Sequence, residues 1–568
     1  MNRIVYCAVT LGDRTEINMK EFDVKGYVSE LTDEELVGEV LSWEFSKNAT
    51  EEELLEAIKK NKVSSFFAHS TYTPEQLAFL RKAIKENSKS PCLITADVER
   101  GPILYPELKD YSTSMMSLGA AKDPSLAFEI GKYTARLCRG MGIGLTLSPV
   151  IDINYNAGNP VTNTRAASDD PDTVLSAAGN YGRGMRSEGN LAITLKHFPG
   201  DGRDDRNQHF CTTVNNMTKE EWMATYGRLY KTMIAEGAEA VMSAHIALPW
   251  CDPTFDECGN MPASLSKTLM TDLLKGELGF DGCIISDAMS MVGTAARVPV
   301  ERLSIEFLRA GGDLVLFPEK EDHKRILEAL RSGYLERERL VDAAERVVKL
   351  KVKLGLFEGR EYKVTEDDIS KMRELLEKAA EKSVTLVRDV DGILPLQLKK
   401  GAKVLAITLS PSPKDHPEDD FPAFADALSE RGYEVIRMTN PMHYKIDEVI
   451  GKVDAVFVTS IIDTTNCTGN SLRLGWNNMM TFWRGYIFKN KNLVFISLGD
   501  PYKLTELPFL KCYINSYVKS GVALKAAVEA CLGEKEFAGK SPVNLANSNL
   551  NRIRQKAENS CYFSKTHS

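Results

Sequence analysis

Residues 279–293 read GFDGCIISDAMSMVG, and this stretch shows the pattern that decides the fold. Its apolar run, Cys283–Ile285, carries no charge, which is typical of a parallel strand buried on both faces. Ser286 and Asp287 follow at the point where such a strand ends. Comparable runs recur along the chain, and amphipathic helical patterns separate them. The other expected strands of this kind are Ser64–Ala68, Pro91–Ala96, Gly144–Ser148, Ala192–Leu195, Ala238–Ala244 and Asp313–Phe317.

The alternation of strand and helix predicts an α/β protein with more than one domain. The chain has 568 residues, and a single hydrophobic core supports only roughly 250–300. Repeated βα units favour a TIM-like (β/α) barrel over an open sheet, and we expect it at residues 1–357. Residues 358–382 are charged and helical, which indicates a linker and a bridging helix. A smaller α/β sandwich is expected at 383–568, with strands at Val404–Leu409, Tyr433–Met438, Ala455–Thr459, Leu493–Leu498 and Lys511–Ser516.

Composition and charge exclude several classes of protein. The net charge of −8 and the pI of 5.7 argue against a nucleic-acid partner, which selects for a basic face. No stretch approaches the ~18 apolar residues of a membrane span, so no membrane contact is expected. The N-terminal apolar run of about eight residues is too short for a secretory signal. The eleven cysteines are scattered without a CxxC pair, as in a cytoplasmic protein with reduced thiols.

Polar and ionisable residues gather directly after the expected strands. In a barrel of parallel strands, that position is the carboxyl-terminal rim, where active sites lie. A structural protein has no reason to concentrate ionisable groups there, so this clustering favours an enzyme. The residues concerned are Asp97, Glu99, Asp152, Lys196, His197, His245 and Asp287.

The stretch LKHFPGDGRDDRNQHF, residues 195–210, gives the strongest local signal. Its Lys196-His197 pair lies at the end of a buried strand, where both side chains are costly to desolvate unless they bind a polar group. A polar loop follows and ends in His209. This combination favours a binding site over a solvated loop.

Other candidate residues allow more than one interpretation. Asp287 could cap the helix that follows it. Arg165 could clamp a substrate hydroxyl, or it could pin its own loop to a carboxylate. Asp97 and Glu99 lie on the same side of a strand and could bind metal or sugar hydroxyls. Because no His or Cys stands at ligand spacing, we expect no metal.

Taken together, these segments resemble glycoside hydrolase family 3. The resemblance extends over nearly the whole chain and includes the second domain, at 383–396 and in the segments LGDPYKL and AGKSPVNL. Within the family, the K-H-F-P-G motif is similar to that of the β-N-acetylglucosaminidase branch. The matching barrel motifs are Asp97-Val98-Glu99, Ser148–Asn154 with Arg165, Lys196–Gly200, Met242–Ile246 and Ile285–Met291.

The resemblance implies a role for each site residue. Asp287 corresponds to the nucleophile, and His209 with Asn207 corresponds to the acid/base dyad. The substrate-binding residues implied are Asp97, Arg165, Lys196, His197, Met242 and His245.

Two positions depart from the pattern of that branch. The dyad usually carries Asp where this chain has Asn207, and Asp204 or Asp205 could supply the lost charge. A second sugar-binding Arg is replaced by Tyr105. The β-glucosidase branch instead takes a Glu from the second domain, but the segment SIIDTTNCTGNSLRLG contains none, which favours His209.

The implied activity is that of a retaining, exo-acting β-glycosidase, most simply a β-N-acetylglucosaminidase (β-hexosaminidase). It would act by double displacement through a covalent glycosyl-Asp287 intermediate, without a cofactor, on a small oligosaccharide or glycoside. A β-glucosidase, a β-xylosidase and a glycoside phosphorylase of the same fold are alternatives. A catalytically impaired sugar-binding protein is the non-enzymatic alternative. The sequence leaves the oligomeric state open, a homodimer included.

Overall fold

A closed ring of parallel strands forms the first part of the structure. The computed structural model describes residues 22–69, 72–101, 105–360, 362–411, 422–464 and 472–545. Within these ranges, five strands pair in one parallel sheet and three in another. Single parallel bridges, Leu145 to Ala192 and Ile285 to Leu314, join the two sheets at both seams. In ring order the strands are β12 (Val315–Leu316), β1 (Leu41–Trp43), β2 (Ser65–Phe67), β3 (Leu93–Ala96), β4 (Ile143–Thr146), β5 (Thr194–Phe198), β7 (Ala240–Ser243) and β11 (Cys283–Ser286).

The ring confirms the TIM-like barrel, but the sequence had predicted only seven of its strands. The missing one is β1, which has just three residues, Leu-Ser-Trp. It follows helix α2 (Asp33–Glu39) after the single residue Val40, so no turn residue marks its start. The interpretation of the N-terminal run falls on residues 1–21, which lie outside the described residues.

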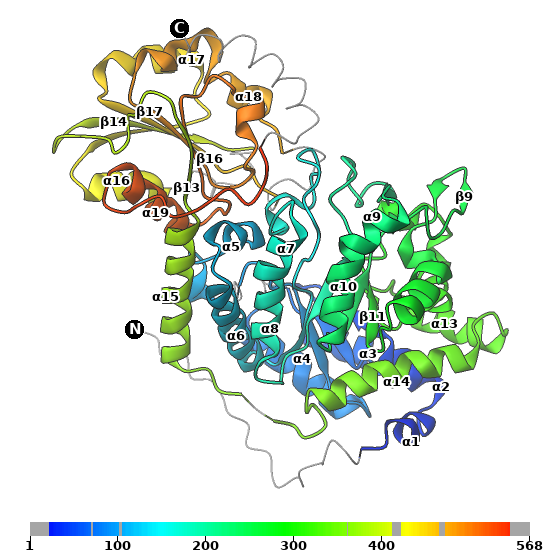
Figure 1. Cartoon of the computed structure of the whole chain (residues 1–568). Coiled ribbons are helices and arrows are strands. Elements are labelled where there is room, and N and C mark those ends of the chain that lie inside the picture. Colours follow the sequence, from blue (N-terminus) through cyan, green and yellow to red (C-terminus); the bar gives the residue numbers. More distant parts are fainter. Residues whose placement is uncertain are drawn as a thin grey trace.

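Helices pack around the ring, and local sequence signals set their ends. Helix α4 (Pro74–Asn87) begins with a capping box: the Thr73 side chain accepts from Gln76 N–H, and the Gln76 side chain accepts from Thr73 N–H. Helix α12 (Leu303–Ala310) ends at Gly311, whose φ of 114° suits glycine. Figure 1 shows these helices surrounding the barrel. No helix of the described residues has the length and apolar character needed to span a bilayer.

The second part of the structure is an α/β sandwich around one sheet. Helix α15 (Glu366–Ser383) packs beside α6 (Pro124–Gly140) and leads into this sheet (Figure 1). The strand order is β13 (Thr385–Asp389), β18 (Cys512–Asn515), β17 (Leu493–Ser497), β16 (Ala455–Ser460), β14 (Lys403–Leu409) and β15 (Glu434–Thr439). All neighbours pair in parallel except β13, which lies antiparallel at one edge.

Successive residues of β14 face two separate cores. Val404 and Ala406 pack in one apolar cluster with helices α16 (Pro422–Glu430) and α19 (Gly521–Cys531), and Leu405 and Ile407 pack in another with α17 (His443–Asp447). The predicted sandwich is therefore confirmed. The boundaries 1–357, 358–382 and 383–568 stay predictions, and α15 ends one residue beyond the second range.

Loops at the carboxyl end of the second sheet contact the rim of the barrel. Asn163 Nδ2 donates to Asp500 Oδ1 at 3.0 Å, and Asn154 Nδ2 donates to the Tyr502 hydroxyl at 2.9 Å. Both asparagines belong to the barrel loop that carries Arg165. The second domain thus helps to hold this loop.

A buried ion pair stabilises the barrel. Lys351 lies on α14 (Arg337–Lys353), is fully buried, and donates to Glu39 Oε2 at 2.7 Å. In Lys351→Ala, Glu39 would remain buried without its counter-charge, so we expect the free energy of unfolding to fall by about 3–5 kcal/mol. Urea denaturation measures this loss. The control Lys60→Ala removes an exposed pair with Glu321 and should cost less than about 1 kcal/mol; equal losses would contradict the prediction.

Candidate active site

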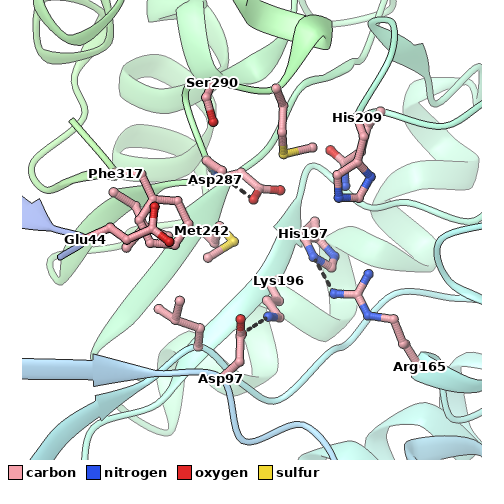
Figure 2. Close-up of a pocket in the computed structure, with 15 residues that line it drawn as sticks. Glu44, Asp97, Arg165, Lys196, His197, His209, Met242, Asp287, Ser290 and Phe317 are labelled. Carbon is pink, nitrogen blue, oxygen red and sulfur yellow. Dashed lines mark hydrogen bonds and ion pairs between the residues drawn. The ribbon is translucent and has the colours of Figure 1, made fainter. Parts of the chain in front are cut away.

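A cavity of about 420 Å³ opens at the carboxyl ends of the barrel strands. Figure 2 shows Asp287 near its centre, with Asp97 and Lys196 on one side and His209 and Arg165 on another. Seven of the residues predicted from the sequence line this cavity: Asp97, Arg165, Lys196, His197, His209, Met242 and Asp287. Four of them, Asp97, Lys196, His197 and Asp287, lie at or directly after strand ends and meet in one space, as parallel strands of a barrel require.

Glu99 joins the two cations of the cavity. Its carboxylate accepts two hydrogen bonds of 2.8 Å from Arg165 and lies 2.6 Å from Lys196 Nζ. Burial alone would raise the pKa of Glu99, but the two positive charges outweigh burial and hold the pKa well below its ordinary value. Lys196 also donates to Asp97 at 2.9 Å. Arg165 thus both lines the cavity and pins its loop to a carboxylate.

Asp152 fixes the orientation of His197. Its Oδ2 lies 2.6 Å from His197 Nδ1, and its Oδ1 accepts from the backbone N–H of His197 at 3.1 Å. On the other side of the ring, Nε2 lies 3.1 Å from Arg165 Nη2. The His197 ring is thus held between Asp152 and Arg165.

Asp287 follows β11 and is not a helix cap. The next helix, α11 (Val292–Ala295), begins after Met291, so the simpler interpretation of Asp287 is wrong. Asp287 Oδ1 accepts from the Ala288 N–H at 2.8 Å. Burial would raise the pKa of Asp287, but the imidazoles of His197 and His245, the Ala288 N–H and Lys196 together lower it. The carboxylate is therefore ionised at neutral pH.

His209 is oriented by Asn207, as the dyad prediction required. Asn207 Oδ1 accepts from the His209 backbone N–H at 3.0 Å and lies 2.6 Å from His209 Nδ1. Because the backbone N–H needs an acceptor, the facing atom is the amide oxygen, and Nδ1 must donate. Nε2 then carries the free lone pair. Burial lowers the pKa of His209 and is only partly opposed by the negative charge of Asp287.

The lost dyad charge is not replaced by Asp204. The Asp204 carboxylate pairs with Arg206 and accepts from the Val214 N–H at 2.9 Å. Through these contacts the Asp204 carboxylate stabilises the loop that carries His209. His209 therefore has an uncharged partner where a carboxylate was one expectation of the sequence.

Two residues lie elsewhere than the sequence suggested. His245 was expected to bind substrate, but it is fully buried behind the cavity, with Nε2 3.0 Å from the Ala288 carbonyl oxygen and Nδ1 2.9 Å from Ser264 Oγ. It supports the backbone beside Asp287. Tyr105, at the position of the second sugar-binding Arg, points away and donates to the Leu137 carbonyl at 2.9 Å.

Sequence reasoning missed part of the cavity lining. Glu44 follows β1, and the rule that polar residues after strands form the site would have found it if β1 had been predicted. Gln208 and Ser290 are neighbours of predicted residues and carried no separate signal. The residues that line the cavity without having been predicted are Glu44, Leu147, Gln208, Ala288, Ser290, Met291, Leu316 and Phe317.

A barrel whose rim gathers an ionised aspartate, an oriented histidine and several other charged side chains is the architecture of a glycoside hydrolase. The chain belongs to glycosyl hydrolase family 3. The family's N-terminal domain, described as "Glycosyl hydrolase family 3 N terminal domain", matches residues 31–350. The chain is therefore an enzyme that acts on glycosidic bonds, which confirms the resemblance seen in the sequence.

Known relatives span much of the chain. It is 31% identical over 497 residues to a protein of Cellulomonas fimi named β-N-acetylglucosaminidase/β-glucosidase, which covers 84% of this chain and 87% of that protein. It is also similar to a β-hexosaminidase of Stenotrophomonas maltophilia, with 32% identity over 276 residues, 47% of this chain and 79% of that one.

Solved structures show the same two-domain fold. A β-glucoside phosphorylase bound to 2FGlc aligns with a TM-score of 0.83 at 29% identity, over 92% of this chain and 96% of that one. A family 3 β-N-acetylglucosaminidase from Paenibacillus sp. aligns with a TM-score of 0.78 at 25% identity, over 91% and 99%.

Gly293 lets the loop of His209 rest against the segment after Asp287. Val292 N–H donates to the His209 carbonyl at 2.9 Å, and a Cβ at Gly293 would overlap the Gln208 carbonyl oxygen. We expect Gly293→Ala to displace His209 and to lower kcat/KM for glycosides with poor leaving groups, by about 100-fold per ångström of displacement.

Activated leaving groups need less acid assistance, so Gly293→Ala should affect them less. Gly276→Ala is the control, because its Cβ would meet only the Thr271 carbonyl oxygen, at 3.4 Å. Steady-state kinetics on both substrate types measure the effect. Wild-type kinetics in Gly293→Ala would show that this contact does not position His209.

Proposed function

We propose that this chain is a retaining, exo-acting β-glycosidase that uses Asp287 as nucleophile and His209 as general acid and base. The main support for the proposal is that an ionised Asp287 and an oriented His209 line the same cavity. Asp287 is held in the ionised state that attack on the sugar requires, and the Nε2 of His209 is the atom that can gain and lose a proton.

In the first step, a carboxylate oxygen of Asp287 bonds to the anomeric carbon as the bond to the leaving group breaks. The protonated His209 gives its Nε2 proton to the departing oxygen. In the second step, neutral His209 takes a proton from water, and the water oxygen bonds to the anomeric carbon as the bond to Asp287 breaks. The sugar leaves with its configuration retained.

Charged residues around Asp287 are suited to bind sugar hydroxyls. Lys196 and Arg165 donate hydrogen bonds, and Asp97, whose side chain is 52% exposed, accepts them. Met242 offers an apolar surface to the sugar ring. Asp152 and Glu99 would act through their neighbours, by fixing His197 and Arg165.

We assign N-acetylglucosaminide as the first substrate class to be tested. The names of the Cellulomonas fimi and Stenotrophomonas maltophilia relatives support this assignment. The first of these names also includes β-glucosidase, so aryl β-glucosides belong in the same substrate panel. We place the activity in the cytoplasm as part of this proposal, and the free cysteines in the described residues support that location.

Phosphorolysis is a second candidate reaction. The His209–Asn207 pair carries no negative charge, so it does not repel an anionic acceptor as a carboxylate acid/base would. The fold similarity to a β-glucoside phosphorylase points the same way. In this reaction a phosphate oxygen would replace water in the second step, and the product would be a sugar 1-phosphate.

The proposed mechanism predicts a trapped intermediate on Asp287. Incubation with an activated 2-fluoro glycoside should add one sugar mass to the peptide that contains Asp287, because the fluorine slows the second step. Asp287→Asn should not be labelled, while Asp272→Asn, which alters an exposed carboxylate, should be labelled as wild type. Absence of label on wild-type protein that still binds sugar would favour the sugar-binding alternative.

Product analysis with added phosphate then separates hydrolysis from phosphorolysis.

The residue at position 207 should influence how kcat/KM depends on pH, because it contacts the proposed acid His209. The lowered pKa of His209 means that its protonated form is lost at a lower pH than for an ordinary histidine. In Asn207→Asp a carboxylate would face Nδ1, raise the pKa of His209 and keep the acid protonated to higher pH. We therefore expect the alkaline limb of kcat/KM for poor leaving groups to move upward. An unmoved or downward-shifted limb would contradict the role of His209 as the acid.

A further inference from the structure

Glu44 lines the cavity, and the mechanism above does not use it. It stands directly after β1, and its side chain is 46% exposed. In Figure 2, Glu44 and Phe317 lie on one side of the cavity and His209 lies on the other, with Asp287 between them. Glu44 is therefore well placed to meet a part of the sugar remote from the leaving group.

His69 holds the Glu44 carboxylate. His69 Nε2 is bonded to Glu44 Oε1, and among the described residues no other side chain is bonded to Glu44. The His69 ring is itself fixed by aromatic neighbours: it lies edge-on to Phe67 at 4.9 Å and parallel to Phe317 at 6.5 Å. One carboxylate oxygen is thus held by the protein, and Oε2 is left to accept a hydrogen bond from a ligand.

Phe317 is held at the cavity wall in an uncommon backbone conformation. Its φ is 58°, in the left-handed region that bulky residues rarely adopt. The Phe317 N–H donates to the Ser42 carbonyl at 3.1 Å, which fixes the turn after β12. Such conformations persist where the surrounding structure requires them, and they gather at ligand sites. The ring completes an apolar wall beside Glu44.

The reaction geometry sets which edge of the sugar faces this wall. The anomeric carbon must lie at Asp287, and the leaving oxygen must face His209. The opposite edge of a pyranose, which carries the C4 hydroxyl and the C6 hydroxymethyl group, then points away from His209. Glu44 and Phe317 lie on that side of the cavity (Figure 2).

We propose that Glu44 is a specificity-determining residue that accepts a hydrogen bond from a C4 or C6 hydroxyl of the bound sugar. The proposal rests on the proposed function, because Asp287 and His209 set the direction of the ring. The ligand class is a neutral pyranoside with a free hydroxyl on its non-reducing edge. A bound sugar that covers the Glu44 carboxylate without offering it a hydroxyl leaves the charge desolvated and unpaired, so the residue selects against sugars that lack this group.

Calorimetric titration with monosaccharides tests the proposal. N-acetylglucosamine and glucose would be compared with their 4-deoxy and 6-deoxy analogues. Wild type should bind a parent sugar on the order of 10- to 100-fold more tightly than one deoxy analogue, as expected for a hydrogen bond to a charged group. In Glu44→Ala that preference should be lost, with little change for the deoxy analogue, and Glu44→Gln should lose part of it. The control Glu86→Gln alters an exposed carboxylate of α4.

The outcomes separate this proposal from the proposed function. If Glu44→Ala weakens the parent and both analogues equally, or if wild type shows no preference, the role of Glu44 is overturned. If the preference follows Glu44 but Asp287 is never labelled by the fluoro sugar, the proposed function fails while Glu44 keeps its role. If wild type binds neither sugar, both proposals fall.

Discussion

Glu99 accepts hydrogen bonds from both cations of the cavity, and the arrangement of the site depends on this buried carboxylate. It joins Arg165, from the loop after β4, to Lys196, on β5. Each of these charges would be costly to bury alone, and together they offset that cost. The network also reaches His197 through Arg165. Binding groups from three parts of the chain are therefore fixed by one set of charge pairs.

The second domain contributes by holding this network in place. Asp500 and Tyr502, from a loop of the second sheet, bind asparagines of the Arg165 loop. Arg100, next to Glu99, pairs with Asp463 of the same domain at 3.0 Å. The loops on both sides of the Glu99–Arg165 pair are thus supported from outside the barrel. This explains how a domain that lines none of the described cavity can still shape it.

The charges on the two proposed catalytic groups follow from their surroundings. Asp287 is kept ionised by neighbouring donors and positive charges in spite of its burial, and burial lowers the pKa of His209. An acid/base of this kind is less often protonated at neutral pH, but it presents no negative charge to an incoming acceptor. The electrostatics of His209 therefore bear on the choice between water and phosphate, and Asn207 is the residue that sets them.

The alternation of strands and helices in the sequence predicted the barrel and the sandwich, and the rule that polar strand ends meet at one rim predicted Asp97, Lys196, His197 and Asp287 in the cavity. Arg165 and His209 were marked as residues of polar loops, and Met242 followed only from the resemblance to the family. The sequence also marked the Asn207–His209 pair, since both lie in one short loop. It did not give β1, whose three residues are too few for a periodic pattern, and Glu44 was missed with it. The sequence also left three outcomes open that the folded chain shows: His245 lies behind the cavity, Tyr105 points into α6, and Asp287 caps no helix. Those outcomes depend on side-chain packing between distant segments, which local sequence patterns do not encode.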